Sequence, residues 1–170
     1  RERIRQIETS SVRKLQQLQN LDGYIATLRN VIYQLLEEHG GLMEKEYLLS
    51  ILVGFSMNGF KSPDQNEHTH KHYLNFLITK LLHKEFEEVT TSKHFRESYR
   101  LKFQELDHLE EILEELLALV HEAKQVRSTA EIIALIKSLS SYKTHQEKLT
   151  TKNTLDISKA LKSDLFSEDA

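Results

Sequence analysis

The chain lacks cysteine and tryptophan, and its 170 residues include one proline and five glycines. Without cysteine it has no disulfide framework, no zinc site built on thiolates and no thiol nucleophile. So few glycines and prolines disfavour an all-β fold, which needs turn residues about every 8–12 positions. A basic excess is missing too, because 23 Lys and Arg stand against 26 Asp and Glu. The net charge of −3 therefore predicts that the chain does not bind nucleic acid, whose phosphates select a basic surface.

Long hydrophobic runs are also lacking. The longest, residues 47–57, is about half of the ~20 apolar residues that a membrane-spanning helix needs. The polar first residues do not have the pattern of a signal peptide. We therefore predict a chain with no integral membrane segment that resides inside the cell, in the cytoplasm.

What the sequence does have is apolar residues at helical spacing. This spacing predicts helices over residues 1–39, 42–60, 69–89, 92–127 and 130–142. The predicted fold class is all-α: an antiparallel helical bundle of four to five helices, two of them long and coiled-coil-like. We expect the bundle to span residues 1–142. Residues 143–170 are expected to form a polar tail rich in Ser, Thr and Lys. Its apolar residues are spaced for one short amphipathic helix: Leu155, Ile157, Leu161 and Leu165.

Two local signals support the predicted helix ends. The Gly40-Gly41 pair is a typical helix stop and follows the first predicted helix directly. Ser128, followed three residues later by Glu131, matches a capping box and predicts the start of the fifth helix.

The first predicted helix carries a long apolar seam that follows a heptad pattern, broken by Ser11 and Lys14. Its members are Ile4, Ile7, Leu18, Leu21, Ile25, Leu28, Ile32 and Leu35. The second and third predicted helices have about half the length of the first, so they leave part of this seam uncovered. We predict that Ile4, Ile7, Leu18, Leu21, Ile25 and Leu28 bind a partner.

Charge suggests a second contact surface. Residues 105–122 carry seven acidic side chains and no Lys or Arg, whereas the chain begins with Arg1, Arg3 and Arg5. One interpretation is a solvated helix face. The other is an acidic strip, formed by Glu110, Glu111, Glu114 and Glu115, that receives a basic partner helix from the same chain or from a second copy.

The predicted function is a non-catalytic protein–protein interaction module, either a scaffold or adaptor or a fragment of a complex subunit. Its partner would be another helical chain or a second copy of itself, and no catalytic residue or cofactor is predicted. One alternative is an accessory helical domain of a multidomain enzyme. Another is a metal-dependent bundle that uses the run His68, His70 and His72, or the pairs Glu67/His70 and Glu105/His108.

Overall fold

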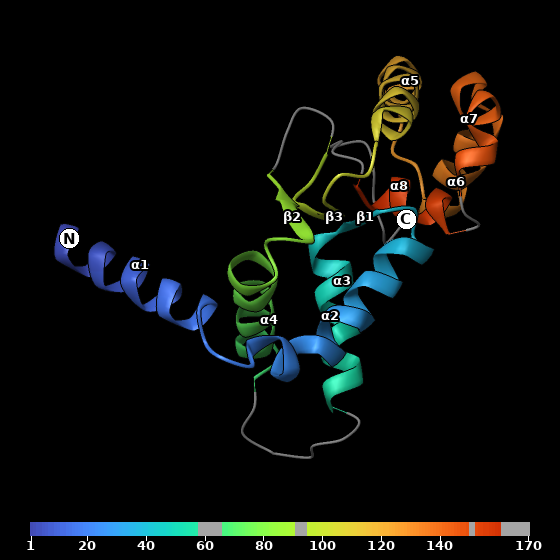
Figure 1. Ribbon diagram of the computed structural model, residues 1–170. Coiled ribbons are helices and arrows are strands. Elements are labelled where there is room, and N and C mark those ends of the chain that lie inside the picture. The colour runs from blue at the N-terminus through green and yellow to red at the C-terminus, as the bar shows by residue number, and fades with distance from the viewer. Residues whose placement is uncertain (58–65, 91–94, 150–151, 161–170) are drawn as a thin grey trace.

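The structure, a computed structural model, describes residues 1–57, 66–90, 95–149 and 152–160 (Figure 1). Its elements follow in the order α1 (Glu2–Gln16), α2 (Leu21–Glu38), β1 (Leu42–Glu44), α3 (Lys45–Met57), α4 (Glu67–Phe76), the π-helical turn η1 (Leu77–Leu81), β2 (Phe86–Val89), β3 (Ser98–Leu101), α5 (Asp107–Ala123), α6 (Thr129–Ser138), α7 (Ser140–Thr144), the 3-10 turn η2 (Gln146–Lys148) and α8 (Asn153–Ala160).

A three-stranded antiparallel sheet lies in the middle of the chain, and the prediction of an all-α bundle of four to five helices is therefore wrong. The strand order is β1-β3-β2, with Met43 opposite Tyr99 and Phe86 opposite Leu101. Each strand lies inside a segment that the spacing assigned to a helix. Strands of three or four residues are too short for the alternation of apolar and polar side chains to stand out from a helical pattern.

The long first helix of the prediction is two helices. α1 ends at Gln16 and α2 begins at Leu21, and between them Asn20 adopts a left-handed conformation with φ of 70°. Asparagine tolerates this conformation better than most residues, so the break is local and costs little conformational free energy. The apolar spacing continues across it, which is why the pattern alone did not reveal it. The fourth predicted helix is shorter as well, because α5 begins at Asp107 after β3 has ended.

The chain turns sharply from α2 into β1 at Gly40 and Gly41, whose φ angles are 74° and 92°. A Cβ at Gly41 would collide with the side chain of Gln104, whose Nε2 donates a hydrogen bond to the Gly40 carbonyl at 3.2 Å. The predicted helix stop is thus confirmed. The predicted capping box is confirmed too, since Ser128 and Glu131 cap α6 reciprocally.

Two hydrophobic cores share the sheet. The first joins α2, α3 and η1 to the sheet and contains Ile32, Leu36, Leu48, Ile78 and Tyr99. The second joins α5, α6 and α8 and contains Ile112, Leu116, Ile132, Ile136 and Ile157. Figure 1 shows α2, α3 and α4 on one side of the sheet, α5 to α7 on the other, and α1 projecting away from both.

The last described helix, α8, forms where the sequence suggested a short amphipathic helix. Ile157 belongs to the second core, and the side chains of Asp156 and Ser158 are buried. Leu161 and Leu165, which the same suggestion included, lie outside the described residues. The division of the chain into residues 1–142 and 143–170 stays a prediction.

Candidate interaction surface

The helix α1 is almost free of tertiary packing. None of its fifteen residues, all of which the structure describes, is buried. Ile4 and Ile7 are 69% and 59% exposed. Together with Ser11 and Leu15 they follow the spacing i, i+3, i+7 and i+11, which places them on one face of the helix. This face is called the α1 stripe below.

A different side of α1 contacts the rest of the protein. Arg5, Thr9, Val12 and Gln16 share a face and lie beside Lys80 of η1. Gln16 Nε2 donates a hydrogen bond to the Lys80 carbonyl at 2.8 Å, which holds the end of α1 in place. Because α1 is attached through this side, the α1 stripe points away from the body of the protein.

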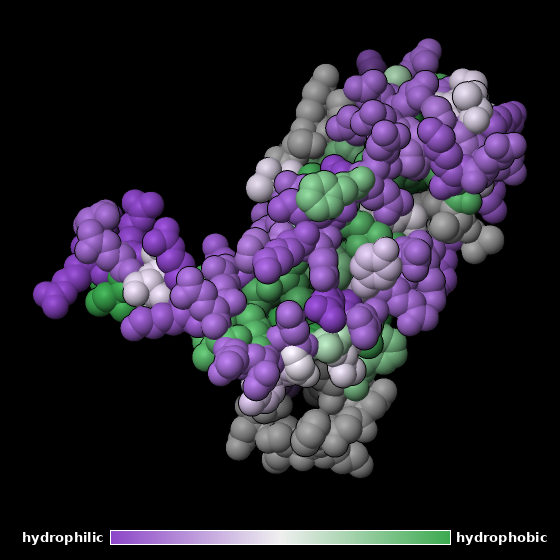
Figure 2. All heavy atoms as spheres, in the orientation of Figure 1, coloured by the Kyte–Doolittle hydropathy of each residue, from purple (hydrophilic) through white to green (hydrophobic). Residues whose placement is uncertain are grey.

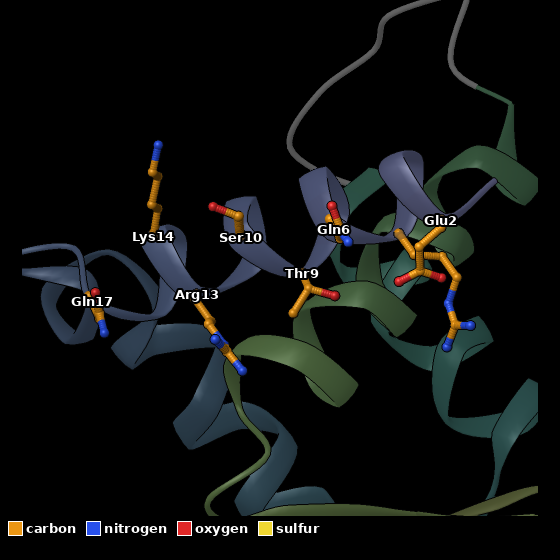
Figure 3. Close-up of a pocket in the computed structure, with 8 residues that line it drawn as sticks. Glu2, Gln6, Thr9, Ser10, Arg13, Lys14 and Gln17 are labelled. Carbon is orange, nitrogen blue, oxygen red and sulfur yellow. The ribbon is translucent and has the colours of Figure 1, made fainter.

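Figure 2 shows α1 as a mainly hydrophilic arm with a small apolar patch near its N-terminal end. Its polar side carries a surface hollow, and every residue that lines it belongs to α1 except Gln17, which follows the helix directly. Figure 3 shows these side chains, among them Glu2, Gln6, Thr9, Arg13 and Gln17, projecting from the single helix. A hollow bounded by one helix is an open face rather than an enclosed ligand pocket.

The predicted partner-binding residues of the seam are divided by the break after α1. Leu18 lies in the connection and is 52% exposed. Ile25 is buried in the first core, and Leu21 and Leu28 are partly buried and pack against it. The structure therefore leaves Ile4, Ile7 and Leu18 available at the surface and uses the other three largely for internal packing.

The four predicted acidic residues lie on the outer side of α5. Glu111 and Glu115 have partners within the chain: Glu111 Oε2 lies 2.5 Å from His145 Nε2, and Glu115 accepts hydrogen bonds from the backbone and side chains of Ser140 and Ser141. The bonds from Ser141 and then Ser140 lower the pKa of Glu115 to about 2. Glu115 thus caps the start of α7, while Glu110 and Glu114 are exposed.

The histidine run does not converge on one point. His68 and His72 are exposed on α4, and His70 between them is half-buried. Glu67 lies on α4 and His108 on α5, so the two Glu/His pairs belong to different parts of the fold. Within the described part of the chain, no group of three or more His, Asp or Glu is placed to hold a metal ion.

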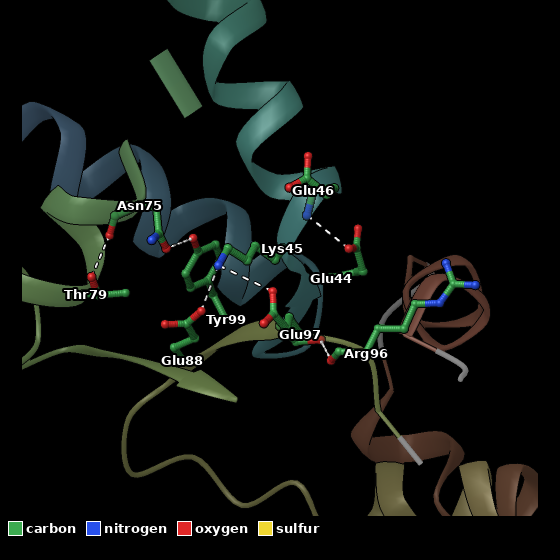
Figure 4. A network of polar contacts seen from close by, with 10 residues as sticks. Glu44, Lys45, Glu46, Asn75, Thr79, Glu88, Arg96, Glu97 and Tyr99 are labelled. Atoms are coloured by element: carbon green, nitrogen blue, oxygen red, sulfur yellow. Dashed lines mark hydrogen bonds and ion pairs between the residues drawn. The ribbon is translucent and has the colours of Figure 1, made fainter. Parts of the chain in front are cut away.

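A polar network joins the sheet to α3 and α4 (Figure 4). Lys45 Nζ donates a hydrogen bond to Glu88 at 2.9 Å and lies 3.5 Å from Glu97. The Tyr99 hydroxyl donates to Asn75 Oδ1 at 2.5 Å, and the whole Tyr99 residue is buried. Burial, followed by the nearby glutamates, raises the pKa of Tyr99 far above its usual range. The hydroxyl therefore stays protonated, and this network is structural.

A buried acid–histidine pair lies where α8 meets the end of α2. His39 Nδ1 is 2.6 Å and 2.7 Å from the two carboxylate oxygens of Asp156, and both residues are at most 4% exposed. Burial lowers the pKa of His39 and raises the pKa of Asp156 to about 8. The pair therefore holds one proton between its two members at neutral pH. The two residues are 117 positions apart, and nothing in the sequence pattern indicated that they meet.

Comparisons with protein-family models, curated proteins and solved structures return no match for this chain. Among the helices of the described segments, none combines the length and apolar character that crossing a membrane requires.

Proposed function

We propose that the protein is a non-catalytic interaction module that binds another protein chain through α1. The single observation that carries the proposal is the exposure of the α1 stripe on a helix with no buried residue. An isolated helix of this length is marginal in water, and most helical stability in proteins comes from packing an apolar face. Docking the α1 stripe on a partner supplies that packing.

The arrangement of charge on α1 supports a protein partner. Arg1 and Arg3 flank the first half of the α1 stripe, and Arg5 lies on the side of the helix beside η1. An amphipathic helix with spaced apolar anchors and flanking charges is suited to a hydrophobic groove with an acidic rim. The intracellular location predicted from the sequence belongs to the same proposal.

Photo-cross-linking tests this proposal in the cells that make the protein. A photoreactive amino acid at position 7 would sit in the α1 stripe, and one at position 9 would sit on the side of the same helix that faces η1. We expect cross-linked protein adducts from position 7 and few from position 9. Equal labelling from both positions, or none from position 7, would contradict the proposal.

A second candidate function, nucleic-acid binding, is favoured by the connectivity of the middle of the chain. The order α2-β1-α3-α4-β2-β3 with sheet order β1-β3-β2 is the connectivity of a winged helix-turn-helix. In helix-turn-helix proteins the second helix of the motif enters the major groove of DNA. That helix would be α4 here, with His68, His72 and Tyr73 exposed.

The charges on α4 make this the weaker candidate. Lys71 Nζ lies 3.1 Å from Glu67 and 3.2 Å from Glu46, so its charge is balanced within the protein. Fluorescence anisotropy with duplex DNA at increasing salt tests the candidate. Affinity that falls steeply with salt, and that the double substitution His68→Glu/His72→Glu weakens, would establish it. The absence of such binding at low salt would exclude it.

The two alternatives from the sequence stay predictions. An accessory domain of a larger enzyme is compatible with an exposed α1, because such a domain also works by contact. Metal analysis of untagged protein tests the metal-dependent bundle, and a stoichiometric transition metal would support it.

A further inference from the structure

An apolar groove lies between α2 and α3. It measures about 360 Å³ and is lined by Val31, Gln34, Leu35, Glu38 and Phe55. Phe55 is 61% exposed, although it is a large aromatic side chain. Such a groove between two helices is a typical binding place for a third amphipathic helix.

The charges at one end of the groove complement α1. Glu37 and Glu38 close the last turn of α2, where the helix dipole adds partial negative charge. Glu38 is paired with Lys152 at 2.7 Å, but both side chains are nearly half exposed and such surface pairs are weak. An arginine-rich helix end is favoured at this position, and Arg1, Arg3 and Arg5 form one at the start of α1.

One antiparallel register, with the end of α1 level with the start of α2 of the second copy, brings Ile7 opposite Val31. In an antiparallel pairing of α1 with α2, Ile7 lies nine residues before the end of α1 (16 − 7), and Val31 lies ten residues into α2 (31 − 21). With Ile7 opposite Val31, Ile4 falls within a turn of Leu35, Arg1 falls opposite Glu37 and Arg3 lies within a turn of it, whereas Arg5 falls opposite Tyr33. The apolar contacts and the charges of Arg1 and Arg3 are thus accommodated together in one orientation.

The α1 helix does not reach the groove of its own chain. It projects away from α2 and α3 in Figure 1, and the side that contacts η1 is not the α1 stripe. Resting on the proposed role of α1, we propose that α1 of one copy docks antiparallel in the α2–α3 groove of a second copy. The exchange is reciprocal and produces a two-fold symmetric dimer in which each copy uses the same two surfaces.

Cysteine cross-linking tests this pairing cleanly, because the native chain contains no cysteine. Two single variants, Ile7→Cys and Val31→Cys, are purified, mixed and oxidised, and the disulfide-linked dimer is measured on a non-reducing gel. The matched control replaces Ile7→Cys with Thr9→Cys on the opposite side of α1. A disulfide requires Cα atoms within about 7 Å, so we expect about tenfold more linked dimer from the Ile7 mixture than from the Thr9 mixture.

The double variant Ile7→Cys/Val31→Cys distinguishes exchange from closure within one chain. A linked dimer supports exchange, whereas a monomer with an internal disulfide overturns it, because α1 would then fill its own groove. Equal yields from the Ile7 and Thr9 mixtures also overturn it. In either case the proposed function as an interaction module still holds if position 7 cross-links to a different protein in cells. Failure of the dimer and failure of the proposed function are therefore separate results.

Discussion

At the scale of single residues, the buried pair His39–Asp156 makes stability depend on pH. In the unfolded chain the two groups have pKa values near 6.5 and 3.8, and folding lowers the first and raises the second to about 8. Burial is the main cause of both shifts, and the charges of Lys152 and Lys159 oppose the rise at Asp156. The folded pair consequently keeps one proton between pH 6.5 and about 8, where the unfolded pair has lost its proton.

The sign of the effect follows from proton counting. Because folding lowers the pKa of His39 and raises that of Asp156 to about 8, above pH 6.5 the folded pair keeps its one proton on Asp156. Between pH 6.5 and 8 the unfolded pair has released its proton and the folded pair has not. We therefore expect the free energy of unfolding to fall as the pH rises through this window. Urea unfolding at several pH values measures it, and Asp156→Asn should remove the fall. If the free energy of unfolding falls equally with pH in the unaltered protein and in Asp156→Asn, the His39–Asp156 pair is not the cause of the fall.

Tyr99 provides a second test at the same scale. Replacing Tyr99 with Phe removes the donor to Asn75 Oδ1 and leaves that partly buried acceptor without it. Such a loss costs about 1–3 kcal/mol of the free energy of unfolding. The matched control is Tyr33→Phe, because Tyr33 is 47% exposed, and this change should leave stability almost unaffected. Equal effects in chemical denaturation would show that the network in Figure 4 is not structural.

At the scale of elements, α1 and α2 share one sequence pattern but differ in what they bury. Ile7 on α1 is 59% exposed, whereas Ile32 on α2 is fully buried in the first core. The two residues are therefore a matched pair of the same type on neighbouring helices.

Alanine substitution of these two isoleucines tests whether α1 and α2 contribute differently to stability. Ile32→Ala should cost about 2–5 kcal/mol, because it leaves a cavity in a packed core. Ile7→Ala should change the free energy of unfolding by less than about 0.5 kcal/mol when the protein is dilute and monomeric. Chemical denaturation measures both. A large loss from Ile7→Ala in the monomer would mean that α1 packs on its own body.

The sequence predicted those parts of the fold that have strong local signals. The capping box at Ser128 and Glu131 and the helix stop at Gly40-Gly41 depend only on residues that are close in sequence. The structure contains both features. The strands were missed because their stability comes from partners far along the chain: Tyr99 in β3 pairs with Met43 in β1 and with Glu88 in β2. The His39–Asp156 pair and the groove at Phe55 were missed for the same reason.

At the scale of the whole molecule, the sheet is shared between two cores, and α8 ties the end of the described chain to both. Ile157 packs in the second core while its neighbour Asp156 binds His39 at the edge of the first. Against this interconnected body, α1 stands apart (Figure 1). Among the described segments, α1 has no buried residue and carries the apolar stripe, and the groove proposed to receive it lies between α2 and α3.

Amide hydrogen exchange at increasing protein concentration tests the central role of α1 most directly. At low concentration the amides of α1 should exchange almost as fast as in an isolated peptide, while those of α2 stay protected. As the concentration rises and light scattering shows dimer, protection should appear in α1 and around Val31, Leu35 and Phe55. Strong protection of α1 in the monomer, independent of concentration, would contradict the proposal that α1 is exposed and free to bind a second chain.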